Sequence, residues 1–181
     1  MDRSVEQFLS QDALEVAPQL LGWTFSTTID DLVTSVLLIE VEAYMGSDDP
    51  ASHAHRGRTP RTEPMFHGGG VIYVYFVYGN HHCVNIVTGP EGSAQAVLLR
   101  GGIPIEGRAT MERRRGRSEN LANGPGRLGQ ALGLTTRHSG MPIDGGMVSL
   151  RPGTPSGTVK ATPRIGISKA VDRPWRFVLE A

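Results

Sequence analysis

Glu40 and Glu42 interrupt the apolar run LLIEVEAY at positions two residues apart. In a strand, alternate side chains share a face, so both carboxylates point to one side while Val41 and Ala43 take the other. Carboxylates are costly in an apolar strand unless they are paired or solvated. One that faces a cleft suits a general base, because burial can raise the pKa of such a group. The alternative is a partner for a structural arginine, and we expect one residue of each kind.

Histidines and the single cysteine are the residue types of a zinc site. His53 and His55 form an H-x-H pair, and His81, His82 and Cys83 form a second group. The segment HAHRGRTPR, however, has the composition of a loop, and no second ligand pair has a recognisable spacing. The zinc deaminase motif needs two cysteines, and there is no Gly-x-Ser-x-Gly elbow for a nucleophilic serine. We therefore predict no metal and no other cofactor.

Three of the four tyrosines lie within VIYVYFVYGNHH, residues 71–82, and the fourth is Tyr44. Runs of β-branched and aromatic residues favour a strand, so the pattern predicts that Tyr73 packs in a core. Tyr78 lies at the mouth of a turn, where the apolar run ends at Gly79 and Asn80. Core packing does not account for Tyr78.

The segments that must position these residues are short and are separated by glycine and proline, which predicts a strand-rich α+β fold. Residues 6–25 have helical spacing, with Asp12 capping a short helix through Ala17 and Gly22 ending the next apolar turn. Residues 46–70 lack apolar periodicity and are expected to form a long functional loop. Strands are predicted at 32–44 (after a turn at Asp30-Asp31), 71–78, 81–88, 93–101, 147–153, 159–168 and 175–180, and helices at 109–115 and 123–134.

Charge is unevenly distributed, although the net charge is zero. Residues 1–49 contain ten acidic residues and one arginine, whereas residues 50–181 contain eight acidic and seventeen basic residues, nearly all arginine. Arginine binds phosphate in two-point contacts, so an arginine-rich face suggests a phosphate partner; the alternative is a solvated charge run. The densest group is Arg100, Arg108, Arg113, Arg114, Arg115, Arg117 and Arg127.

The location of the protein is predicted from what the sequence lacks. It has no apolar stretch long enough for a membrane span, and its acidic start is unlike a signal peptide. A single cysteine excludes an internal disulfide and fits a reducing compartment. We expect a cytoplasmic protein.

Five motifs in order resemble the bacterial-type alkyladenine (3-methyladenine) DNA glycosylase family. They are EVEAYMGSDDPASHAHRGRTPR, MFHGGGVIYVYFVYGNHHCVNIVT, AVLLRGGIPIEG, NGPGRLGQALG and PRIGISKAVDRPWRF, and they span nearly the whole chain. The resemblance implies one domain, residues 1–181, with a curved, open barrel-like antiparallel sheet and short helices packed around it. It also implies a monomeric enzyme that flips alkylated purines out of double-stranded DNA and hydrolyses the bond to the sugar C1′, leaving an abasic site.

The resemblance further implies a role for each matching residue. Glu42 would activate the water, and Arg100 and the main-chain carbonyl of Ile165 would help to hold it. Asn80 departs from the family, which often has an apolar residue after the Tyr-Gly of the wedge. The other implied roles are enclosure of the flipped base (Tyr44, His53, Tyr75), exclusion of the guanine amine (Asn85), filling of the gap in the duplex (Tyr78) and phosphate binding (Arg58, Thr59, Arg61, Arg127).

Two other functions compete with this one. A bifunctional glycosylase/lyase needs an amine nucleophile, and the only lysines, Lys160 and Lys169, both lie outside the tyrosine-rich region of the sequence. A nucleic-acid-binding domain without activity would use the same basic and aromatic residues. Such a binder gains nothing from Glu42, because a carboxylate repels a phosphate-rich ligand.

Overall fold

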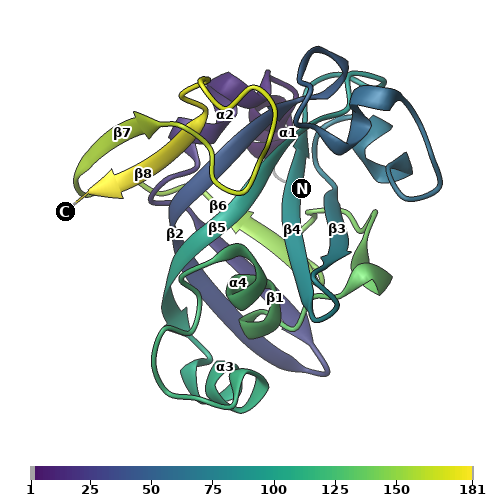
Figure 1. Ribbon diagram of the computed structural model, residues 1–181. Helices are drawn as coiled ribbons and strands as arrows, with labels where there is room; N and C mark the ends of the chain where they lie inside the picture. Colours follow the sequence, from purple (N-terminus) through teal and green to yellow (C-terminus); the bar gives the residue numbers. More distant parts are fainter. Residues whose placement is uncertain (1–2, 181) are drawn as a thin grey trace.

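The computed structural model describes residues 3–180, and the eight strands of this part of the chain form one curved sheet (Figure 1). Six strands follow the order β3-β4-β5-β2-β1-β6, and β8 pairs with both β2 and β7; all these pairings are antiparallel. The predicted α+β class with a curved antiparallel sheet is confirmed. The strands are β1 (Thr24–Ile29), β2 (Leu32–Met45), β3 (Ile72–Val77), β4 (His81–Thr88), β5 (Gln95–Glu106), β6 (Val148–Arg151), β7 (Thr158–Thr162) and β8 (Arg176–Glu180).

Short helices surround the sheet, and helix α4 lies across β4 and β5 (Figure 1). Within residues 3–180 no helix combines the length and the apolar character needed to cross a membrane. The α-helices are α1 (Arg3–Leu9), α2 (Ala13–Gln19), α3 (Arg108–Arg115) and α4 (Pro125–Ala131), and the 3₁₀ turns are η1 (Gly46–Asp48), η2 (His53–Arg56), η3 (Glu63–Phe66) and η4 (Thr136–His138).

The longest strand, β2, changes one of its neighbours at Glu40. As far as Leu37 it pairs with β1, and from Glu40 to Glu42 it pairs with β8. On its other side β2 pairs with β5, with register shifts on both sides of Glu40. Irregularities of this kind bend a strand and redirect its side chains. The two carboxylates therefore lie where the sheet changes direction and partner.

Helices α1 and α2 cover the core with the apolar residues expected of the first segment. The predicted cap is wrong: Asp12 is the N-cap residue of α2 but makes no capping hydrogen bond. Its carboxylate accepts from Gln95 Nε2 at 2.8 Å, and Gln95 Oε1 accepts from the Ala13 amide at 2.8 Å. The cap is thus supplied from β5, and the helix continues to Gln19 instead of ending at Ala17.

The strand predicted over residues 159–168 is wrong in its second half. Strand β7 ends at Thr162, because Pro163 has no amide to donate to a neighbouring strand. Gly166 then has a φ of 76°, in the left-handed region. Residues 163–175 form a loop between β7 and β8 (Figure 1). This loop, which we call the β7–β8 loop, contributes to the site described below.

The arginines of α3 do not form a simple solvated run. Arg114 donates to the carbonyl of Ala131 at 3.1 Å, and Arg115 donates to that of Leu121 at 3.1 Å. Burial lowers the pKa of both side chains. Arg100, on β5, is separate from them. These contacts connect α3 to α4 and to the segment that precedes α4. The sequence predicted either phosphate binding or a solvated charge run for this group, and neither includes this structural role.

Candidate active site

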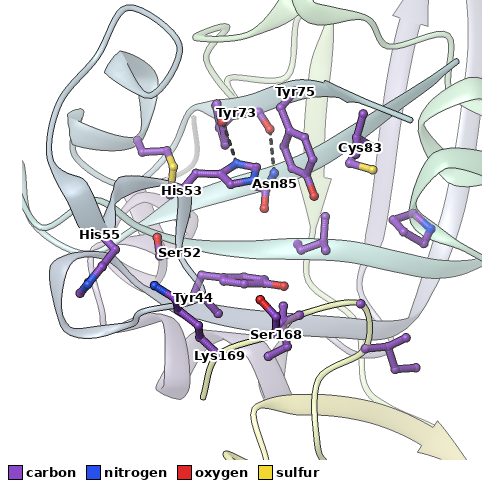
Figure 2. A pocket seen from close by; sticks show the side chains of 18 of the residues that line it. Tyr44, Ser52, His53, His55, Tyr73, Tyr75, Cys83, Asn85, Ser168 and Lys169 are labelled. Carbon is purple, nitrogen blue, oxygen red and sulfur yellow. Dashed lines mark hydrogen bonds between the residues drawn. The ribbon is translucent and has the colours of Figure 1, made fainter. Parts of the chain in front are cut away.

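A pocket of about 600 Å³ lies between the sheet and the loops at one of its ends (Figure 2). The predicted loop 46–70 forms part of its wall through residues around η2, and the β7–β8 loop forms another part. The rest comes from strands β2, β3, β4 and β5, the β3–β4 hairpin and the start of α4. Seven of the candidate residues line the pocket: Tyr44, His53, Tyr75, Tyr78, Asn85, Arg100 and Ile165.

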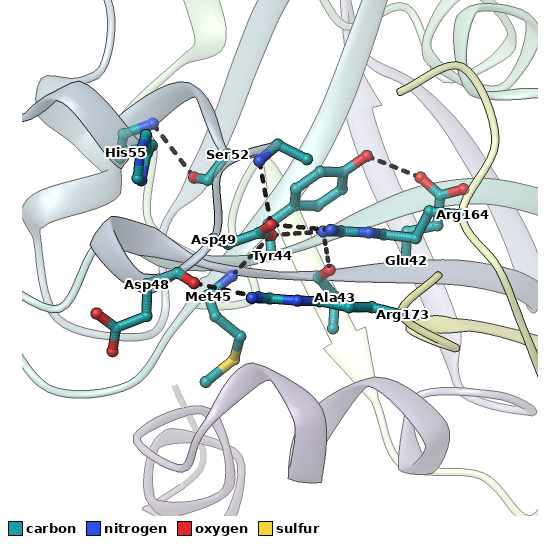
Figure 3. Close-up of polar contacts among 12 residues, drawn as sticks. Glu42, Ala43, Tyr44, Met45, Asp48, Asp49, Ser52, His55, Arg164 and Arg173 are labelled. Carbon is teal, nitrogen blue, oxygen red and sulfur yellow. Dashed lines mark hydrogen bonds and ion pairs between the residues drawn. The ribbon is translucent and has the colours of Figure 1, made fainter. Parts of the chain in front are cut away.

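The carboxylate of Glu42 is fully buried beside this pocket and receives polar contacts from three residues. Its Oε1 accepts a hydrogen bond from the Ile165 amide at 2.8 Å and lies 3.3 Å from Arg100 Nη1. Its Oε2 accepts from the Tyr44 hydroxyl at 2.9 Å (Figure 3). Ile165 thus contacts the Glu42 carboxylate directly, through its amide nitrogen. Two hydrogen bonds and the charge of Arg100 offset the cost of burying the carboxylate.

Glu40 has a different environment from Glu42. Its Oε1 accepts from Arg100 Nε at 2.8 Å and from Arg176 Nε at 2.7 Å. Burial alone would raise the pKa of Glu40, but the two arginines outweigh burial and lower it. Glu40 is therefore an ion-pair partner of Arg100 and Arg176, and Glu42 is the carboxylate beside the pocket. The expectation of one residue of each kind agrees with this geometry.

Aromatic rings from η2 and β3 form one wall of the pocket (Figure 2). The His53 ring is perpendicular to that of Tyr75, with 4.5 Å between their centres, and His53 Nδ1 lies 3.0 Å from the Tyr73 hydroxyl. Burial, together with the charge of Arg61, lowers the pKa of His53 and keeps the imidazole neutral near pH 7. Tyr73 is 1% exposed, as its predicted core position requires, and its hydroxyl still orients His53.

Asn85 lies in the floor of the pocket, where it is almost fully buried. Its side-chain amide donates to the main-chain oxygen of Tyr73 at 3.1 Å (Figure 2). This bond fixes the side chain, because Tyr73 and Asn85 are paired across β3 and β4. The pocket therefore has a rigid polar group among its aromatic walls.

Tyr78 lies at the tip of the β3–β4 hairpin and is 80% exposed. It has a φ of 54° and Gly79 has a φ of 72°, so two consecutive residues are left-handed. This conformation suits glycine but costs a tyrosine about 1–2 kcal/mol. An exposed aromatic residue in a strained turn is typical of functional sites. Its position agrees with the turn predicted from the sequence.

The predicted phosphate contacts lie outside the pocket wall. Arg58 pairs with Glu63 at 3.1 Å on an exposed surface, and the Arg61 guanidinium lies 5.7 Å from the centre of the Tyr75 ring. The amide of Thr59 donates within its own turn. A phosphate role for these residues and for Arg127 stays a prediction.

Three features of the pocket were missed by sequence reasoning. Lys169 lies outside the tyrosine-rich region of the sequence, but the fold brings it into the lining of the pocket (Figure 2), so its distance in sequence does not exclude it from the site. Arg164, inside the motif PRIGISKAVDRPWRF, is buried against the pocket residue Tyr44. Asp49 is its partner. In the sequence, Arg164 appears only as a lone arginine between Pro163 and Ile165. Nothing in that pattern indicates a partner more than a hundred residues earlier.

The predicted absence of a metal site stays a prediction. Among residues 3–180, no three His, Cys, Asp or Glu side chains are grouped as a metal site would require. His53 and His55 have separate partners: the Nδ1 atom of His55 contacts the main-chain oxygen of Ser47 at 2.7 Å.

Comparisons with known proteins identify the class to which this fold and site belong. A family model described as methylpurine-DNA glycosylase (MPG) matches residues 7–181. A protein of Cutibacterium acnes is 49% identical, over 93% of this chain and 92% of its own length, and one of Rhodopseudomonas palustris is 45% identical, over 96% and 82%. A third, from Chlorobium phaeovibrioides, is 43% identical, over 99% and 94%. All three carry the name "Putative 3-methyladenine DNA glycosylase". The chain belongs to the methylpurine-DNA glycosylase family, as its motifs predicted.

Proposed function

We propose that this protein is a monofunctional DNA glycosylase that removes alkylated purines, chiefly 3-methyladenine, and leaves an abasic site. The single observation that carries the proposal is the buried Glu42 carboxylate, held by Arg100 and Ile165 next to a pocket with aromatic walls. A pocket of about 600 Å³ is large enough to enclose one purine base. The family and the names of the relatives support the same activity.

In this proposal Glu42 takes a proton from the water that attacks the sugar C1′. A carboxylate has about four lone-pair sites. Oε1 accepts from the Ile165 amide and forms an ion pair with Arg100, whereas Oε2 has the Tyr44 hydroxyl as its donor among the described residues. The remaining site of Oε2 is the place for the water. The main-chain carbonyl of Ile165 and the guanidinium of Arg100 would complete its hydrogen bonds.

The pocket residues would bind the base after it leaves the duplex. Tyr44, Tyr75 and His53 offer ring faces or edges, and base–aromatic stacking is worth about 1–3 kcal/mol per base. An alkylated ring nitrogen gives the purine a positive charge, which aromatic faces attract and which makes the base a good leaving group. Asn85 would crowd the exocyclic amine of guanine and so exclude it.

Tyr78 would occupy the gap that the flipped base leaves. Inserted side chains offset part of the cost of unstacking a base pair. The exposure of Tyr78 and its place at the hairpin tip support this role. Arg58, Thr59, Arg61 and Arg127 would bind phosphates of the same duplex.

The position of Lys169 favours a second candidate, a combined glycosylase and lyase. A lysine in the pocket wall could attack the C1′ aldehyde of an abasic product. An amine becomes a nucleophile when burial or a neighbouring cation removes its proton, and Lys169 is exposed. Hydrolysis through Glu42 is therefore the better-supported reaction.

The test is incubation with methylated duplex DNA, followed by chromatography of the released bases. We expect 3-methyladenine among the products and an intact strand until alkali is added. Release of no base, with binding of the DNA retained, would instead support a nucleic-acid-binding domain without activity.

A further inference from the structure

Arg164 is a buried cation that the proposed reaction does not use. Its side chain has no exposed surface, and it forms a two-point ion pair with Asp49, whose side chain is equally buried (Figure 3). The Nη2–Oδ1 distance is 2.8 Å. Burial alone would raise the pKa of Asp49, but the hydrogen bonds and charge of Arg164 outweigh burial and lower it. The pair is therefore ionised inside the protein.

The guanidinium also contacts Ala43 and Tyr44, the two residues that follow Glu42. Its Nη1 donates to the main-chain oxygen of Ala43 at 3.0 Å, and its central carbon lies 4.6 Å from the centre of the Tyr44 ring. Tyr44 lines the pocket, whereas Arg164 is not among the residues that line it. The Tyr44 ring thus separates the guanidinium from the pocket.

Arg164 directly precedes Ile165, whose amide donates to Glu42. One side chain therefore fixes the orientation of the Tyr44 ring, the carbonyl between Glu42 and Tyr44, and the peptide that approaches the carboxylate. Asp49 in turn accepts hydrogen bonds from the amides of Ala51 and Met45, which connects the pair to the loop after β2. The contacts join three segments of the site at one point.

We propose that the Arg164–Asp49 pair is a positioning device for the glycosylase reaction, and this inference rests on the proposed function. The pair holds the Tyr44 ring, on which the base would stack, and the Ile165 peptide, which would orient Glu42. Misplacement of reacting groups by about 1 Å can reduce a rate by about 100-fold. The pair therefore sets the rate of base release more than the affinity for DNA.

A purely electrostatic role is the weaker explanation. A cation behind an aromatic ring would reduce the attraction of that ring for a cationic base. Here the bidentate carboxylate of Asp49 neutralises Arg164 at close range, so that little net charge remains to act through Tyr44. Positioning requires the flat, forked shape of the guanidinium, which a lysine does not supply.

Two variants test the proposal. Arg164→Lys keeps a cation opposite Asp49 but loses the fork and the flat surface under Tyr44. The double variant Asp49→Leu/Arg164→Met removes both charges, and such replacements of a buried pair are often neutral or stabilising. Arg173→Met is the matched control, because Arg173 belongs to the same loop and stacks on Trp175, as Arg164 does, without contacting Tyr44 or Glu42.

The measurement is single-turnover release of 3-methyladenine from methylated duplex DNA at saturating protein, alongside the thermal midpoint and the affinity for unmodified duplex. We expect release 10- to 100-fold slower in both Arg164 variants, with affinity within twofold of the parent and the double variant as stable as the parent. The Arg173 control should keep the parent rate.

If the pair only stabilised the fold, a double variant as stable as the parent would also release 3-methyladenine at the parent rate. Such a result would overturn the proposal. So would release by Arg164→Lys within twofold of the parent, or an equal loss in the Arg173 control. Failure of the unaltered protein to release 3-methyladenine would instead contradict the proposed function and not the positioning argument.

Discussion

The hydroxyl of Tyr44 donates to the carboxylate of Glu42 at 2.9 Å, although the two residues are only two positions apart on β2. Burial, and then the charge of Glu42, raises the pKa of Tyr44, so the hydroxyl keeps its proton and remains a donor. The residue proposed to stack on the base is thus bonded to the residue proposed to activate water. A change at either residue is therefore expected to affect both base binding and the activation of water.

Glu42→Gln is expected to reduce base release by about 10²–10⁴-fold, the usual contribution of a general base. The amide keeps the shape of the side chain but cannot take a proton from water. Affinity for lesion DNA should be kept or slightly improved, because a negative charge near phosphates is lost. Single-turnover release and a binding titration measure the two effects. Normal excision by this variant would assign the reaction to another residue, and Glu40→Gln would then be the next variant to examine.

Tyr78→Gly should separate stability from binding. Glycine relieves the left-handed strain at this position, so the free energy of unfolding should rise by about 1 kcal/mol. Affinity for a lesion duplex should fall by about 1–3 kcal/mol if the ring fills the vacated gap. The loss should be smaller on a single strand, where no gap forms. Unchanged binding to the lesion duplex would place the wedge elsewhere.

Tyr73→Ala provides the contrast, because Tyr73 is buried in the core on the same hairpin. We expect destabilisation of about 3–5 kcal/mol from the cavity. Denaturant unfolding of the two variants distinguishes the core tyrosine from the tip tyrosine.

Stability should rise with pH between about pH 5 and pH 7. Burial lowers the pKa of His53, His82 and His138 in the folded protein. The unfolded chain, with histidine pKa values near 6.5, binds more protons in this range, so the stability present above pH 6.5 is lost as the pH falls. Urea unfolding at several pH values measures the slope. His138→Asn should reduce that slope, since an amide oxygen can replace the Nδ1 acceptor for the Thr135 amide without titrating. A free energy of unfolding that does not change between pH 5 and pH 7 would contradict the lowered pKa values of these histidines.

Borohydride should trap no covalent complex between the protein and an abasic or lesion-containing duplex. This expectation follows from the exposure of Lys169 and from the proposed hydrolysis through Glu42. Denaturing electrophoresis detects a trapped complex. A complex that forms with the parent and disappears in Lys169→Met would move the protein into the bifunctional class.

Treatment with a strong chelator should leave base release unchanged. His53 bonds to Tyr73 and His55 to Ser47, so these two imidazoles have separate partners, and no metal-binding group is present among residues 3–180. The release assay, repeated after dialysis against chelator, makes the comparison. Loss of activity that zinc restores would revive the histidine and cysteine groups as ligands.

Most of the strands and the glutamate pair could be predicted from the sequence because their signals are local, but β1 was missed. Alternation of apolar and polar residues marks β2, and the hairpin around Gly79 follows from a turn between two apolar runs. The same rules wrongly continued a strand beyond Pro163. They also assigned the cap of α2 to Asp12, when Gln95 supplies it from a distant strand.

The Arg164–Asp49 pair and the position of Lys169 could not be predicted, because no periodicity or spacing encodes them. Arg164 bonds to a carboxylate 115 residues away in the sequence, and Lys169 reaches the pocket through a loop whose course depends on the sheet. The resemblance to the family assigned Ile165 a role but gave none to its neighbour. Contacts of this kind are decided by tertiary structure.

Strand β2 pairs with β1 along its first half and with β8 further on, and this change of partner has a consequence for folding during synthesis. A ribosome extends the chain from its amino end, so Glu42 is synthesised 123 residues before Ile165, and Glu40 is synthesised 136 residues before Arg176. Until those partners emerge, Glu42 lacks the Ile165 amide and Glu40 lacks Arg176, and β2 has an open edge beyond Leu37. Pairings this distant in sequence form slowly. The proposed active site is therefore completed late in synthesis, after all the tyrosines of its pocket have been made.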